Sequence, residues 1–118
     1  MGSQRLDRLA SQLVREVSEI FQREISDPRI TWVTVTRATI SPDLHEARIY
    51  LNTIETGEKR AQVLEGAKAA EKFIRRELGH RLQLRVTPNL HFFMDEDLEK
   101  AERISKILSD LKREGEAK

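Results

Sequence analysis

The stretch that decides the fold runs from Gly57 to Asp95 and reads GEKRAQVLEGAKAAEKFIRRELGHRLQLRVTPNLHFFMD. Its first part has the periodicity of a long helix that stops at Gly79, and residues 84–95 read as a strand. Five apolar residues of the helix recur at steps of three and four, which places them in one stripe: Val63, Ala67, Ala70, Ile74 and Leu78. We expect a sheet to cover this stripe.

The opposite side of the same helix carries cations. Lys68, Lys72, Arg75 and Arg76 stand at positions i, i+4, i+7 and i+8, a spacing that predicts one solvent-facing group. Residues 58–94 hold eight bases against four acids, a surplus of +4 in a chain whose net charge is +1. Such a surface suits the phosphates of a polyanion. The alternative is an ordinary solvated helix face, on which local ion pairs contribute little.

Length and composition indicate one soluble domain. A chain of 118 residues can bury a real core, and we expect a single domain over 1–118, ordered over 3–112 with a flexible tail at 113–118. The absence of cysteine excludes disulfides, thiol catalysis and sulfur-ligated zinc. No apolar run approaches the ~20 residues of a membrane span, and no charged segment followed by an apolar one opens the chain. We therefore predict a cytoplasmic protein without membrane contact.

The segment before Gly57 predicts a helix followed by a hairpin. Residues 3–25 keep helical spacing until Pro28 and the residue before it end the helix. Residues 31–41 and 47–52 are rich in β-branched side chains and flank a proline turn, which predicts two antiparallel strands. The inward positions of the first strand change phase by one residue, so we expect a β-bulge near Thr36 and Arg37.

The chain after the predicted third strand forms a last helix. Three successive carboxylates at residues 95–97 are typical of a helix N-terminus, where they meet the positive end of the helix dipole. Leu98, Ala101, Ile104, Leu108 and Leu111 continue at helical spacing to about residue 112. The predicted architecture is an α+β domain with a three-stranded sheet and helices packed on one face.

Signals for catalysis are scarce. The chain has no G-x-S-x-G, no G-x-x-x-x-G-K-[ST] and no H-E-x-x-H motif, and only His91 with Asp95 shows even a vague metal-ligand spacing. The carboxylates at residues 95–97 could serve in acid and base catalysis, but helix capping explains them without any reaction. We predict no metal site, no cofactor and no small-molecule substrate.

Aromatic residues offer a second route to nucleic acid. Trp32 and Tyr50 could stack on unpaired bases, because every base presents a π face. We expect Trp32 to pack in the core or at the sheet edge instead, whereas both readings remain open for Tyr50. Phe92 and Phe93 are neighbours on a strand and must point to opposite faces, so one of them could cover the outer side of the sheet.

Four ordered blocks of the chain resemble the ribosome-binding factor A family: QREISDPRI at 22–30, the hairpin from VTVT to ARIY at 33–50, KFIRRELG at 72–79, and LRVTPNLHF at 84–92 with Asp95. The match covers residues 5–111. It implies a type II KH-like domain of order α-β-β-α-α-β, here with an added C-terminal helix. It also implies the small (30S) ribosomal subunit and its 16S rRNA as partners, with a role in late maturation, rRNA processing and cold adaptation.

Two positions depart from the family pattern. An ordinary KH domain clamps RNA with a GXXG loop, which this chain lacks, and the family instead has an Ala-x-Gly kink between two helices. The matching residues here are Ala70, Glu71 and Lys72, so lysine replaces the glycine and one gently bent helix becomes possible. The family's usual glutamate after the proline is Asn89, which weakens any role assigned to that carboxylate.

We hypothesise that the chain binds ribosomal RNA without catalysing a reaction, using six cations of the central stretch: Lys68, Lys72, Arg75, Arg76, Arg81 and Arg85. The alternative is a protein adaptor that uses the arginine face of residues 5–23 or an exposed sheet edge to bind a ribosomal protein or a GTPase. No long heptad seam favours a coiled-coil dimer, so we expect a monomer.

Overall fold

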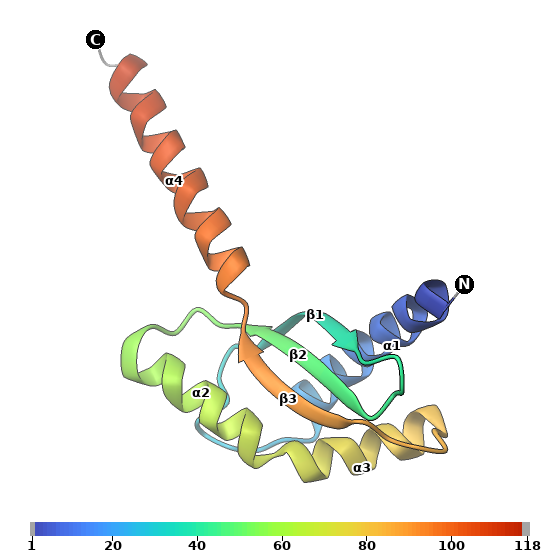
Figure 1. Ribbon diagram of the computed structural model, residues 1–118. Helices are drawn as coiled ribbons and strands as arrows, with labels where there is room; N and C mark the ends of the chain where they lie inside the picture. Colours follow the sequence, from blue (N-terminus) through green and yellow to red (C-terminus); the bar gives the residue numbers. More distant parts are fainter. Residues whose placement is uncertain (1, 117–118) are drawn as a thin grey trace.

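A computed structural model describes residues 2–116, apart from the side chains of residues 2, 3, 98, 99, 114 and 116. The elements are α1 (Gly2–Arg23), β1 (Thr34–Ile40), β2 (Glu46–Asn52), α2 (Gly57–Ala69), α3 (Glu71–Leu82), β3 (Asn89–Met94) and α4 (Glu96–Glu116) (Figure 1). This order confirms the α+β, type II KH-like class with an added C-terminal helix. Helix α4 includes residues 113–116 of the expected tail, and residues 117 and 118 lie outside the described part.

The three strands form one sheet in the order β1-β2-β3. Strands β1 and β2 are antiparallel, and β2 and β3 are parallel. Val35 pairs with Leu51 while Arg37 pairs with Tyr50, so Thr36 is the extra residue of a β-bulge, as the sequence predicts. The bulge corrects the phase of β1 and keeps its apolar residues on the covered face.

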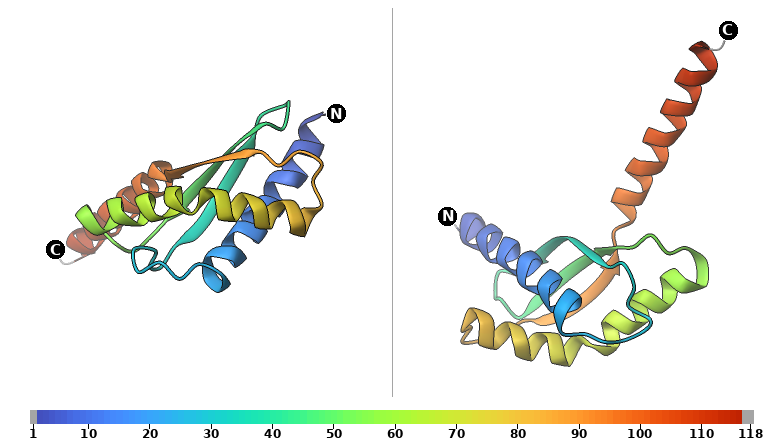
Figure 2. Two further views of the ribbon diagram at one scale, coloured as in Figure 1. Left: turned by 90° about the horizontal axis from the view of Figure 1, so that it is seen from below. Right: turned by 180° about the vertical axis from the view of Figure 1, so that it is seen from behind.

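Helices α1, α2 and α3 cover the same face of the sheet (Figure 2). The predicted stripe of α2 and α3 is buried at Val63, Ala67, Ile74 and Leu78 and half-buried at Ala70. Phe92 of β3 meets Phe21 of α1 edge to face, with 5.9 Å between the ring centroids. The core therefore lies between this layer and the sheet, and the outer sheet face meets solvent.

The third helix and third strand differ from prediction at their junction. Helix α3 continues through Gly79 and ends at Leu82, because Gln83 takes the left-handed conformation (φ 49°) that closes the helix. A Cβ at Gly79 would lie 2.9 Å from Thr87 Oγ1, so this glycine permits close packing of the following loop. Strand β3 begins at Asn89 rather than residue 84, since Pro88 has no N–H for a ladder.

Helix α4 does not pack on the sheet, so the expectation that all helices cover one face is wrong for this element. It projects away from the body (Figure 1), because α1, α2 and α3 already occupy the covered face. Large apolar side chains of α4 are exposed: Ile104, Ile107, Leu108 and Leu111. The side chain of Leu98 lies outside the described part, within which no helix is long and apolar enough to span a membrane.

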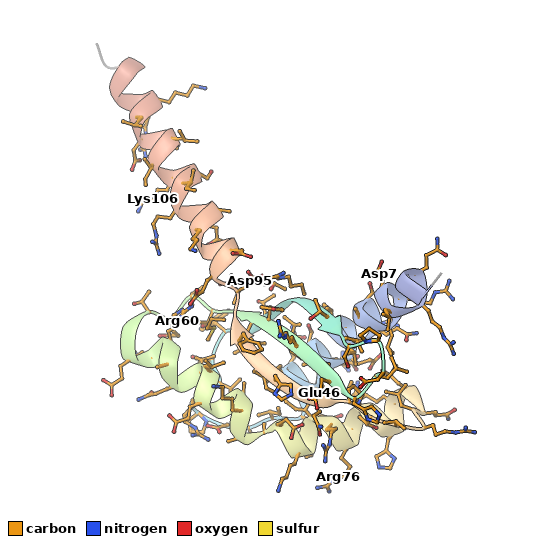
Figure 3. All side chains as sticks on the ribbon, in the orientation of Figure 1. Asp7, Glu46, Arg60, Arg76, Asp95 and Lys106 are labelled. Atoms are coloured by element: carbon orange, nitrogen blue, oxygen red, sulfur yellow. The ribbon has the colours of Figure 1, made fainter. Side chains whose placement is uncertain are left out.

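Asp95 anchors the start of α4 to the sheet (Figure 3). Its buried carboxylate accepts a 2.6 Å hydrogen bond from Thr36 Oγ1 and lies 3.4 Å from Arg37 Nε. Its backbone N–H donates to Leu51 O at 2.8 Å. This carboxylate therefore joins the bulge to the helix N-terminus, which accounts for its burial without a catalytic role.

Gly66 provides a test of the packing between α2 and the loop after α1. An added Cβ would lie 2.9 Å from Ile30 Cγ1 and 3.3 Å from Arg29 Cβ. We expect Gly66→Ala to lower the free energy of unfolding by about 1–2 kcal/mol, because overpacking outweighs the gain in helix propensity. Urea unfolding measures the effect.

Gly115→Ala in α4 is the matched control, because nothing lies within 4 Å of a Cβ at that position. This variant should unfold at the same urea concentration as the parent chain or slightly above it. If Gly66→Ala were as stable as the control, the close contact between α2 and Ile30 would be wrong.

Candidate nucleic-acid interface

Helices α2 and α3 meet in a kink at Ala70, whose backbone angles are φ −88° and ψ 1°. The Ala70 N–H donates to the carbonyls of Gly66 and Ala67 at 3.1 Å, and the Ile74 N–H donates to Ala70 O at 3.0 Å. Because φ is negative, residues other than glycine can adopt these angles, so the kink does not require a glycine. The two helices are therefore separate, and Lys72 lies inside the first turn of α3.

Glu71 connects the kink to the edge strand. Its Oε1 accepts the backbone N–H of Leu90 at 3.0 Å, which satisfies a donor that an edge strand would otherwise expose. Arg75 donates to Asn89 Oδ1, and Asn89 Nδ2 donates to Glu46 Oε1 at 3.2 Å. The family's usual glutamate position is thus occupied by an amide that bridges a cation and an anion.

Glu46 completes this network on the outer sheet face. Its carboxylate contacts the His91 ring, and hydrogen bonds from His91 and Asn89 lower the pKa of Glu46 below its usual range. His91 is therefore a partner of Glu46 rather than of Asp95. Sequence spacing did not reveal this network, because its members come from β2, α3 and β3 and meet only in the fold.

A groove of about 520 Å³ lies between the kink and β3. Its walls are Lys68 and Glu71 on the helical side and residues 89–93 on the strand side. The groove places a cation, an amide, an imidazole and the Phe93 ring along one open surface. Side chains of these types can contact phosphate, sugar and base edges of a nucleic acid.

Three predicted cations are exposed in the helices that meet at the kink: Lys68 in α2, and Lys72 and Arg76 in α3. Arg76 lies on the side of α3 that faces away from the sheet (Figure 3). Arg85 is also exposed, in the loop between α3 and β3 rather than in a strand. Among the described side chains, no carboxylate forms an ion pair with any of these four cations. We call these four residues the kink cations.

Arg75 and Arg81 are held by neighbours and differ from the kink cations. Arg75 is half-buried and bound to Asn89. Arg81 reaches the end of α1, where its guanidinium lies 3.1 Å from Glu16 and 3.5 Å from Glu19 of the helix and 2.5 Å from Glu24, the residue that follows it. Hydrogen bonds to Glu16 and Glu24 raise the pKa of Arg81 above its usual value. Arg81 therefore joins α3 to α1 and is not displayed with the kink cations.

The aromatic side chains discussed above do not form one common surface. Tyr50 stacks on Phe93 with 5.7 Å between ring centroids, and the Arg37 guanidinium lies 3.9 Å from the Tyr50 ring centre. Phe92 and Phe93 point to opposite faces, as predicted. The expectation that Trp32 packs in the core or at the sheet edge is wrong, because its side chain is 73 % exposed. Its positive φ of 52° is incompatible with a strand, and β1 begins only at Thr34.

Several known proteins with similar sequences carry the same name. The family model "Ribosome-binding factor A" matches residues 5–108. The chain is 38 % identical over 108 residues to ribosome-binding factor A of Acetivibrio thermocellus, covering 91 % of this chain and 88 % of the relative. It is 40 % identical over 114 residues to the Thermomicrobium roseum protein of the same name, and the match covers 97 % of this chain and 88 % of that relative.

Solved structures give the same result. The crystal structure of ribosome-binding factor A from Thermus thermophilus matches with a TM-score of 0.68 and 27 % identity, over 75 % of this chain and 93 % of that one. A similar match is a homology model of the Thermus thermophilus factor that was fitted into a cryo-EM map of its complex with the 30S subunit. The TM-score is 0.63 and the identity 27 %, and the match covers 75 % of this chain and 92 % of that one. This chain belongs to the ribosome-binding factor A family.

Proposed function

We propose that this protein is a cytoplasmic, monomeric assembly factor that binds the small (30S) ribosomal subunit through its 16S rRNA. In this proposal it assists late maturation and rRNA processing by stabilising one arrangement of the rRNA, and it catalyses no reaction. Membership of the family supports the choice of the ribosome. The observation that supports RNA as the contacted component is the group of kink cations, which carry no carboxylate partner among the described side chains.

Electrostatics and shape act together at this surface. In this proposal phosphates of a folded RNA meet the exposed Lys68, Lys72 and Arg76, and binding releases the counterions of the RNA. Arg85 extends the contact along the loop that leads to β3. Glu71 and Asn89 contribute by holding the start of α3 against β3, so that the helix that carries Lys72 and Arg76 keeps its position. Rigid placement reduces the conformational entropy lost on binding.

A protein can act on the rRNA by binding alone, and this action has a simple energetic basis. A ligand shifts an equilibrium by its difference in affinity for two states. A factor with higher affinity for the mature arrangement of the rRNA therefore favours that arrangement. The groove beside the kink, with Lys68 and His91 among its walls, provides a place for an unpaired nucleotide next to the phosphate contacts.

Salt dependence of binding tests the electrostatic part of the proposal. If each of the four kink cations contacts one phosphate, the logarithm of the association constant should fall with the logarithm of salt concentration at a slope of about −2.8 to −3.6. Sedimentation of the protein with purified small subunits at several salt concentrations measures this slope. A slope near zero would contradict binding through phosphates.

Digestion of the RNA separates this function from a protein adaptor. Small subunits treated with nuclease should lose the protein if rRNA is the contacted component. Retention on the residual ribosomal proteins at full occupancy would favour the adaptor instead. The arginine face of α1 is the adaptor's candidate surface, and one of its neighbours, Glu16, already pairs with Arg81.

A further inference from the structure

A row of stacked side chains crosses the outer face of the sheet. Tyr50 of β2 stacks on Phe93 of β3, with 5.7 Å between the ring centroids and 30° between the ring planes. The guanidinium of Arg37 on β1 lies 3.9 Å from the centre of the Tyr50 ring. Because β2 lies between β1 and β3, these two neighbours approach Tyr50 from opposite sides. Tyr50 is therefore covered on both sides, and Phe93 ends the row at the edge strand.

The far end of this row is fixed by two carboxylates. Arg37 Nε lies 3.4 Å from Asp95, and Arg37 Nη2 lies 3.4 Å from Asp97. Asp95 is itself buried and accepts the hydrogen bond of Thr36 Oγ1 in the bulge. The Phe93 ring thus rests on a support that is held in place before any ligand arrives. A ring supported in this way loses little conformational entropy when another planar group stacks on it.

Phe93 is 42 % exposed and borders two depressions. One of them, with a volume of about 390 Å³, is also bordered by Tyr50 and Arg37. The other is the groove of about 520 Å³ beside the kink, and its walls among the described residues include Phe93 but not Tyr50. The surface that Phe93 presents to the groove is therefore not covered by Tyr50. It leaves room for one more planar group at the end of the row.

Cations lie on both sides of the edge strand that carries Phe93. Lys68, one of the kink cations, forms part of the helical wall of the groove. On the other side, Arg48 of β2 is exposed on the outer face, two residues from Tyr50 and paired in register with His91. Among the described side chains, no carboxylate forms an ion pair with Lys68 or Arg48. Both cations are therefore placed to meet an anion.

Two carboxylates near the groove already have donors within the protein. Glu71 accepts the backbone N–H of Leu90 at 3.0 Å. Glu46 accepts Asn89 Nδ2 at 3.2 Å and contacts the His91 ring. An open aromatic surface alone would also suit a protein partner. Unpaired cations beside that surface favour a nucleotide instead, because a nucleotide carries a base that stacks and a phosphate that pairs with a cation.

We propose that Phe93 is the stacking platform for one unpaired base of a single-stranded RNA segment. The base occupies the groove, a phosphate of the same segment meets Lys68, and the segment crosses the edge strand towards Arg48. Tyr50 and Arg37 support the platform and do not themselves stack on a base. This inference rests on the proposed function and deepens it, because it adds a base contact to the phosphate contacts of the kink cations.

Substitution of Phe93 tests the stacking. Phe93→Leu keeps a large apolar side chain beside Tyr50 but has no π face. We expect its affinity for small subunits to fall about tenfold, with an unchanged salt slope because no charge is altered. Phe93→Tyr keeps the ring and should retain most of the affinity. Full affinity of Phe93→Leu, or an equal loss in Phe93→Tyr, would overturn the inference, and thermal unfolding checks that both variants are folded.

Site-specific cross-linking identifies the occupant of the groove. A photoreactive p-benzoylphenylalanine is placed at position 93 or, as a control, at the exposed Thr39 on β1, and each protein is irradiated while bound to purified small subunits. We expect a cross-link to rRNA from position 93 and none from position 39. A cross-link from position 93 to a ribosomal protein or a second copy, or none despite intact binding, would overturn the inference.

The parent chain separates this inference from the proposed function. If the parent chain did not bind small subunits, the proposed function would fail and this inference with it. If the parent chain bound with the expected salt slope while Phe93→Leu bound equally well, only the stacking platform would be wrong.

Discussion

Replacing Lys72 and Arg76 together with glutamate is expected to weaken binding to small ribosomal subunits by about 30- to 100-fold near 0.1 M salt. Each phosphate contact contributes about five- to tenfold at that concentration through counterion release, and the new carboxylates add repulsion. Both side chains are exposed, and neither forms an ion pair with a described carboxylate, so the fold should not change. Sedimentation measures affinity, and thermal unfolding checks the fold.

The matched control reverses Arg8 and Arg15, which are exposed on α1 and change the net charge of the chain by the same amount. It should retain most of the affinity, whereas the Lys72 and Arg76 variant should also lose about 2 from the magnitude of the salt slope. Equal losses in both variants would show a response to total charge alone. A loss confined to the control would favour the adaptor surface on α1.

The apolar pattern predicted most of the fold because burial has the same period as the secondary structure. The stripe of α2 and α3 is covered by the sheet even though a kink divides it, since Ala67 and Ile74 lie on the same side of the break. The bulge at Thr36 was also predictable, because the inward residues of β1 change phase there. These features depend on local periodicity, which a single sequence displays.

Features that depend on tertiary contacts could not be predicted in this way. Gly79 looked like a helix stop, but its role is to admit Thr87, and the stop is the left-handed Gln83. The kink at Ala70 keeps angles that any residue can adopt, so the missing glycine was a poor guide. In both cases the chain turns at a residue other than glycine, which local propensity does not mark.

The candidate site was predictable to the same extent. Helical spacing correctly predicted that Lys68, Lys72 and Arg76 are exposed, because these positions lie away from the buried stripe of α2 and α3. It also included Arg81, which pairs with Glu16 and Glu19 of α1 and with Glu24 just after that helix. The spacing of residues along one helix carries no information about acidic residues elsewhere in the chain. Ion pairs between different elements could therefore not be predicted.

Phe92→Ala is expected to lower the free energy of unfolding by about 3–5 kcal/mol, a large part of the roughly 5–15 kcal/mol typical of a domain. Phe92 is 2 % exposed and meets Phe21 edge to face, so its loss leaves a cavity between the sheet and α1. Phe93→Ala, one residue along, is the control. Phe93 is 42 % exposed and stacks on Tyr50, so its removal should cost about 0.5–1.5 kcal/mol.

Urea unfolding of both variants tests the register of β3, because a slip by one residue would exchange the two faces. The same pair separates stability from binding. Phe92→Ala should lose subunit affinity only in proportion to its unfolded fraction, since its side chain points into the core. Similar losses of stability in the two variants would contradict the alternation of β3 and, with it, the groove between that strand and the kink, on which the placement of Lys68 and His91 depends.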